Sequence, residues 1–165
     1  MPMKLVRWSL WFLLLALAGC GFHLRGQGEP PLAVESIYVD AAGAPMLGNE
    51  LRALLRQRDI PLAADRERAD VVITLSGEQF DRRVLSVDPD TGKAREFQIA
   101  YQANVRATRG DTELLPGQSL EQLRDYLFDE TAVLGKSAEE SQLHREILRE
   151  SADTVLGMVR RALNR

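Results

Sequence analysis

The chain is poor in the residues from which metal sites and nucleophilic sites are usually built. Its 165 residues include one cysteine, Cys20, and two histidines, His23 and His144. A lone cysteine forms no internal disulfide, and histidines this far apart do not suggest a zinc site. The run 117–119 starts like a nucleophile elbow, but Glu121 stands where the second glycine is needed. We therefore predict no metal, no cofactor and no enzymatic activity.

An excess of positive charge is also missing. The whole chain carries 21 basic and 24 acidic residues, a net charge of −3. Residues 1–19 include Lys4 and Arg7 but no acid, so the remainder has 19 basic residues against 24 acidic ones. Proteins that bind nucleic acid usually present a basic surface. The composition therefore argues against a nucleic-acid partner.

The one long apolar run, residues 10–18, follows two basic residues and ends at Leu17-Ala18-Gly19-Cys20. A basic start, an apolar centre and a small-residue cleavage site are typical of a secretory signal. The run is too short for a membrane-spanning helix, which needs about 20 residues. Its end resembles the bacterial lipobox, and Gly21, rather than aspartate, resembles the outer-membrane sorting type. We predict a lipoprotein signal peptide at 1–19 and lipidation at Cys20; the alternative is a plain signal peptide with a chance cysteine.

Residues 20–33 are rich in glycine and proline and are predicted to be a lipidated tether, which leaves 34–165 as one domain. The clearest element in the domain is a strand over 97–107, in which every second residue is apolar. Similar alternation predicts strands at 34–39, 71–76 and about 120–128. Helical spacing predicts a helix at 45–58 and a long helix that begins at a capping box of Ser137 and Glu140.

This order of elements, β-α-β-β-β-α, predicts an α+β fold. Two amphipathic helices and a sheet with one wet face make a two-layer sandwich with both α-helices on one face. The first strand–helix–strand unit is expected to cross over right-handed. The four-stranded sheet is therefore predicted to be mixed.

A second resemblance follows the lipobox. The run Cys20-Gly21-Phe22-His23-Leu24-Arg25-Gly26 is similar to the mature start of the LPS-assembly lipoprotein LptE (RlpB) family. The similarity continues at 97–99, at 127–129 and in the run 132–136 before the last helix. The resemblance covers nearly the whole chain after the signal peptide.

The resemblance implies a role without chemistry. Proteins of this family sit as a plug in the lumen of the outer-membrane β-barrel LptD, with which they form a heterodimer. They are needed for the barrel to assemble, and the pair delivers lipopolysaccharide to the outer leaflet. The family is also thought to touch lipopolysaccharide directly. We therefore expect an outer-membrane protein, lipid-anchored, with its domain inside the barrel lumen.

Candidate contacts with the anionic ligand are the basic residues of the middle hairpin: Arg82, Arg83, Lys93 and Arg95. Lys136 is a further candidate, because it matches a basic position of the family before the last helix. Lipid A carries phosphates, with which arginine can make paired hydrogen bonds. The alternative is that these residues only solvate the hairpin and a loop. The residues 88–90 depart from the family, since some relatives have an arginine there.

Two other functions stay open at the level of the sequence. One is a scaffolding or binding lipoprotein of another envelope machine, such as a secretion or pilus system. The other is a lipid-anchored hydrolase whose site has no familiar motif. Co-purification with a large barrel would favour the barrel-plug role that the family resemblance implies. A pocket of convergent polar groups would favour the hydrolase.

Overall fold

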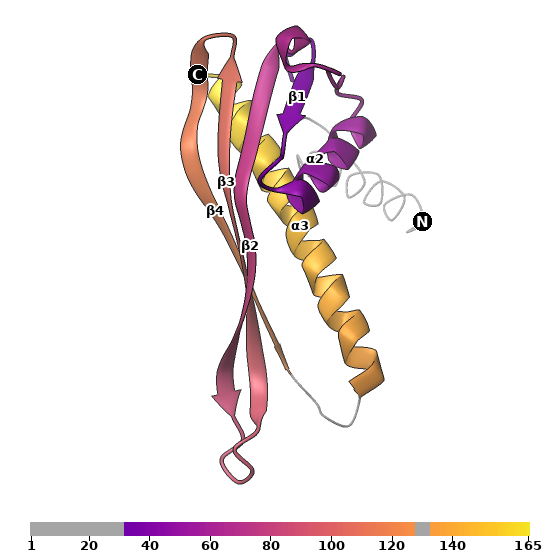
Figure 1. Cartoon of the computed structure of the whole chain (residues 1–165), viewed down its shortest axis with the longest axis vertical. Coiled ribbons are helices and arrows are strands. Elements are labelled where there is room, and N and C mark those ends of the chain that lie inside the picture. Colours follow the sequence, from indigo (N-terminus) through magenta and orange to yellow (C-terminus); the bar gives the residue numbers. More distant parts are fainter. Residues whose placement is uncertain (1–31, 128–132) are drawn as a thin grey trace, which may run out of the picture. The chain divides into compact units, whose positions relative to one another are not determined.

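The computed structural model describes residues 32–127 and 133–165, and residues 32–165 form one compact unit. The predicted signal peptide and tether, including Cys20, lie outside the described residues. The elements are β1 (Ile37–Asp40), α2 (Pro45–Gln57), a short 3-10 turn (Arg66–Arg68), β2 (Val71–Val87), β3 (Ala94–Arg109), β4 (Thr112–Leu127) and α3 (Val133–Leu163). The predicted order of strands and helices is confirmed (Figure 1).

The sheet is four-stranded and mixed, as predicted, with the spatial order β1-β2-β3-β4. β1 runs parallel to β2, with Ile37 opposite Val71, and the other two pairings are antiparallel. In β3 the alternating apolar residues are buried and the residues between them are mostly not. This face packs against α2 and α3 in a single core.

The sequence of α2 explains where the helix begins, how it packs and where it ends. Proline occupies its first turn, and Leu47, Leu51 and Leu55 are buried one turn apart. Gly48 lies between them, where an added Cβ would come within 2.2 Å of the Ala41 Cβ, so glycine allows the helix to approach the end of β1. Past the helix, Asp59 takes a positive φ of 54° and the chain reverses.

β2 is much longer than the predicted strand 71–76. The prediction stops early because a bulge changes which residues, odd-numbered or even-numbered, face the helices. Gly77 has φ of 65°, and the pairing shifts by one residue between Ser76 and Gln79. Before the bulge the odd-numbered residues face the helices, whereas after it Phe80 lies opposite Tyr101 and the even-numbered residues do so. A search for strict alternation therefore loses the strand at Gly77.

The start of α3 differs from the prediction. The helix begins at Val133, so Ser137 is its fifth residue and does not cap it. The Ser-x-x-Glu pattern is only a local signal, and the preceding residues contain no proline to stop the helix from starting earlier. Lys136 consequently lies within the helix and not in a loop before it.

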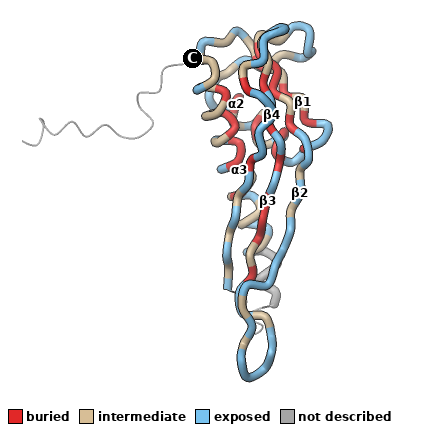
Figure 2. The backbone as a smooth tube through the Cα atoms, turned by 90° about the vertical axis from the view of Figure 1, so that its left-hand side faces the viewer, coloured by how far each residue is buried: buried red, intermediate tan, exposed pale blue. Residues whose placement is uncertain are grey.

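The unit 32–165 has two unequal halves. Figure 2 shows the buried residues concentrated where α2, α3 and all four strands meet, while the β2–β3 hairpin beyond them is largely exposed. Exposed large apolar side chains gather on this outer half of the sheet: Val84, Leu85, Val87, Leu123 and Leu127. The hydrophobic core thus lies at one end of the unit, and an exposed hairpin lies at the other.

Candidate functional site

The tip of the β2–β3 hairpin is held by the side chain of Asp88. Its carboxylate oxygen Oδ1 accepts hydrogen bonds from the backbone N–H groups of Asp90 (3.1 Å) and Thr91 (2.9 Å) and from the Thr91 hydroxyl (3.0 Å). These bonds, first those from Thr91, lower the pKa of the Asp88 carboxyl below its ordinary value. Arg95 lies 3.7 Å from the other carboxylate oxygen. The tip is therefore an ordered turn in which Arg95 already has an acidic partner.

Arg82 faces the helices. Its guanidinium lies 4.6 Å from the centre of the Phe97 ring and 3.6 Å from a carboxylate oxygen of Glu140 in α3. Phe97 in turn stacks on Tyr126, with ring centres 5.7 Å apart. Burial and the nearby Glu140 charge raise the pKa of the Tyr126 hydroxyl. Arg82 thus joins the hairpin to α3, and its charge is already paired with Glu140 of the same domain.

Arg83 faces the opposite side of the sheet. It lies opposite Gln98 in the register and is exposed. Within residues 32–127 and 133–165, its guanidinium makes no hydrogen bond or ion pair. Arg83 is therefore the candidate of the hairpin whose charge is available to a ligand.

The remaining candidates do not complete one cluster. The Lys93 carbonyl accepts a hydrogen bond of 2.7 Å from the Asp88 N–H, which places Lys93 at the tip. The side chain of Lys136 lies outside the part that the structure describes. Arg82 and Arg83 are neighbours in sequence but lie on opposite faces of the sheet. The role of all five residues stays a prediction.

Sequence reasoning missed the exposed apolar residues of the hairpin and of the neighbouring end of β4. Leu85 and Leu127, which are 47% and 68% exposed, line a shallow cavity of about 330 Å³ with Glu96, Asp125 and Tyr126. The available signal was the mostly apolar segment 84–87, which lies outside the strands predicted from the sequence. The hairpin therefore presents charged and apolar groups side by side, as a surface for an amphiphile or for another protein would.

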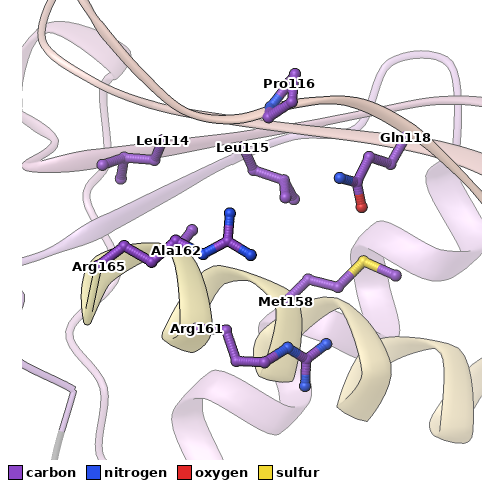
Figure 3. Close-up of a pocket in the computed structure, with 8 residues that line it drawn as sticks. All are labelled: Leu114, Leu115, Pro116, Gln118, Met158, Arg161, Ala162 and Arg165. Atoms are coloured by element: carbon purple, nitrogen blue, oxygen red, sulfur yellow. The ribbon is translucent and has the colours of Figure 1, made fainter.

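A second cavity, of about 130 Å³, lies between the last turns of α3 and the first half of β4. Figure 3 shows its lining residues: Leu114, Leu115, Pro116, Gln118, Met158, Arg161, Ala162 and Arg165. The Arg165 guanidinium lies between the helix and the strand, whereas the Arg161 side chain runs back along α3.

The described part of the chain shows neither a cluster of metal ligands nor a membrane-spanning helix. It holds no group of three or more histidine, cysteine, aspartate or glutamate side chains placed to hold a metal ion. None of its helices is both long and apolar enough to cross a membrane.

Comparison with known sequences gives one consistent family. The model of the LptE family, described as lipopolysaccharide-assembly, matches residues 34–157. The LPS-assembly lipoprotein LptE of Pectobacterium atrosepticum is 26% identical over 149 residues, which cover 89% of this chain and 80% of the relative. The LptE of Photorhabdus laumondii is also 26% identical, over 144 residues, 87% of this chain and 78% of the relative.

Solved structures have the same fold. The solution structure of the uncharacterized lipoprotein B from Nitrosomonas europaea is 25% identical and covers 82% of this chain and 88% of its own, with a TM-score of 0.67. The crystal structure of the rare lipoprotein B from Shewanella oneidensis is 24% identical, covers 74% of this chain and 91% of its own, and has a TM-score of 0.64.

Proposed function

Because the chain belongs to the LptE lipopolysaccharide-assembly family, we propose that it is an outer-membrane lipoprotein that occupies the lumen of the LptD β-barrel. In this role it is needed for assembly of the barrel and helps to deliver lipopolysaccharide to the outer leaflet. The family match over residues 34–157 carries the proposal, because it spans nearly the whole described unit and not only a short motif. The role involves binding and assembly and no catalysis.

The outer face of the sheet supports a position inside a barrel. Between the buried residues of β3 stand polar ones: Gln98, Gln102, Asn104 and Arg106. They project from the face that the helices do not cover. The interior of an outer-membrane barrel is also polar. A domain with its apolar face covered by its own helices can therefore fill such a lumen without exposing its core.

The β2–β3 hairpin supports direct contact with lipopolysaccharide. Lipid A combines phosphates with acyl chains, so a surface that binds it needs cationic and apolar groups together. Arg83 has no partner among the described residues, and Leu85 and Val87 follow it on the same strand with about half of their surface exposed. Arg82 and Arg95 are held by acids of the fold and are weaker candidates.

The predicted anchor at Cys20 is compatible with this geometry. Arg109, at the end of β3, donates a hydrogen bond of 2.9 Å to the Ala33 carbonyl and one of 3.0 Å to the Asp70 carboxylate. These bonds fix where the chain enters the unit, at the end of the sheet opposite the β2–β3 tip. Leu32 lies twelve positions after Cys20, and at most about 3.6 Å per position the chain between them reaches about 43 Å.

The test is co-purification. The full chain with a C-terminal affinity tag is expressed in its own bacterium, extracted from outer membranes in mild detergent, and analysed by mass spectrometry and a lipid A assay. We expect a one-to-one complex with a large β-barrel, and lipopolysaccharide with it. An untagged chain is the control. Recovery of a secretion or pilus component without a barrel would replace the proposal with the scaffolding role.

A further inference from the structure

We propose that the cavity between the end of α3 and β4 binds the phosphate of an anionic phospholipid in the membrane leaflet that holds the lipid anchor. The inference rests on the anchored location proposed above, but it concerns a different end of the domain from the β2–β3 hairpin. It assigns a binding role to Arg161 and Arg165, which the lipopolysaccharide candidates do not include.

The charge of the cavity suits an anion. Neither guanidinium, of Arg161 or of Arg165, has a hydrogen bond or an ion pair in the described structure, and no lining side chain is acidic. The nearby Glu113 is paired with Arg106, at 3.0 Å. The C-terminal end of a helix carries roughly half a negative charge, which two guanidinium groups more than neutralise. The cavity therefore keeps positive charge although the chain as a whole is acidic.

The shape of the cavity suits a headgroup with the start of a lipid tail. Its volume of about 130 Å³ is close to that of a cavity of roughly 150 Å³ that binds benzene, so it holds one small group and not a whole lipid. The Arg165 guanidinium lies in the gap between helix and strand, and Leu115 lines the same cavity from the strand (Figure 3). Met158 and Leu114 supply apolar walls, and the Gln118 amide can donate to a phosphate oxygen.

The position of the cavity indicates that the phosphate comes from a lipid of the anchoring leaflet. Leu115 lies opposite Ala107, in the same part of the sheet as Arg109, which holds Ala33. The chain therefore enters the domain at the same end of the sheet as the cavity. The β2–β3 tip is about 50 Å away along a strand of 16 residues at about 3.3 Å per residue, which exceeds the reach of the tether. The end with the cavity is thus the end nearest to the anchoring leaflet.

The experiment uses the chain from residue 20 with Cys20→Ser, because the complete core lies in residues 32–165. Its partition is measured at low ionic strength onto vesicles of phosphatidylglycerol mixed with phosphatidylcholine, and onto phosphatidylcholine alone. Each arginine near an anionic surface strengthens binding by about fivefold. We therefore expect Arg161→Gln with Arg165→Gln to weaken the partition by about 25-fold. The matched control is Arg56→Gln with Arg145→Gln, which removes the same charge from exposed helix positions elsewhere and is expected to have little effect.

Two further arms decide whether the cavity itself is the site. Arg161→Lys with Arg165→Lys keeps the charge but loses the paired hydrogen bonds to phosphate, so we expect it to bind more weakly than the wild type. Wild-type partition by this variant, or an equal loss in the control pair, would overturn the headgroup site. So would a parallel loss of lipopolysaccharide binding, because the cavity would then belong to that ligand. Neither barrel nor lipopolysaccharide is present in the vesicle assay, so its failure leaves the assembly role intact. Melting curves verify that every variant is folded.

Discussion

Glu78 joins the sheet to the start of α2, and its removal is the sharpest test of how the fold is held together. Its carboxylate accepts hydrogen bonds from the N–H groups of Met46 (2.9 Å) and Leu47 (2.8 Å) and from the Tyr101 hydroxyl (2.8 Å). α2 has no side-chain cap of its own and no acidic residue in its first turn. Glu78 therefore serves as the N-terminal cap of α2 from a neighbouring strand.

The cost of Glu78→Ala follows from these three bonds. Losing an N-terminal cap costs about 0.5–2 kcal/mol. The side chain of Tyr101 is fully buried, and a buried hydroxyl without a partner costs about 1–3 kcal/mol. We expect a loss of about 3 kcal/mol in the free energy of unfolding, measured by urea denaturation. Glu78→Gln keeps one acceptor oxygen, but its NH2 group replaces the other oxygen and meets a donor. It is therefore expected to cost about 1–2 kcal/mol, less than Glu78→Ala.

A double-mutant cycle with Tyr101→Phe separates the two terms. Alone, Tyr101→Phe is expected to cost about 1 kcal/mol as one hydrogen bond. In the Glu78→Ala background it is expected to be neutral or stabilising, because it removes the hydroxyl that the first change left unpaired. Gln79→Ala, at the next residue and exposed, is the control and should cost little. Additive costs in the cycle would refute the Glu78–Tyr101 hydrogen bond, and a loss at Glu78 no larger than at Gln79 would refute the cap.

Four further outcomes are expected. Ile99→Ala removes a buried side chain and should cost about 2–5 kcal/mol, whereas Gln98→Ala on the other face should cost little in the isolated domain; equal losses in urea denaturation would contradict the two-layer arrangement. The pKa of Asp88 measured by NMR should lie below 3.8, so its contribution to stability is complete above that ordinary value and is lost as the pH falls through the lower folded pKa; an ordinary pKa would mean that the turn is not formed. Reversal of the charges of Arg83 and Arg95, or Lys136→Asp, should weaken lipopolysaccharide binding at low salt with little change in melting temperature. Unchanged binding in every variant would exclude contact through these residues. Cys20→Ser should abolish labelling by radioactive palmitate, and persistent labelling with membrane association would remove the lipoprotein assignment.

The strands show what a sequence pattern can and cannot predict. β3 was predicted well because its apolar residues keep one phase from Phe97 to Ala107. β2 was predicted only to Ser76, because the bulge at Gly77 moves the helix-facing residues from odd to even numbers. The start of β4 was missed for a different reason. Pro116 and Gly117 weaken its local strand signal, whereas pairing of Thr112 with Arg109 sets the strand from its neighbour.

The candidate site shows the same limit. The sequence grouped Arg82 and Arg83 because they are adjacent, but adjacent residues of a strand point to opposite faces. The partner of Arg82, Glu140, lies 58 positions along the chain and is brought near only by the packing of α3. Long-range ion pairs of this kind have no local signal. The sequence could therefore identify the hairpin as basic but not which of its charges is available.

The distribution of apolar residues separates stability from binding in this domain. The fully buried side chains lie where the helices cover the sheet, and they need no contribution from the hairpin tip. Val87 and Leu127, in contrast, are 55% and 68% exposed near the other end. Apolar residues gathered on a surface in this way are typical of a contact with another molecule. Because they add little to the core, changes at these positions report on binding, whereas changes at Glu78 or Ile99 report on folding.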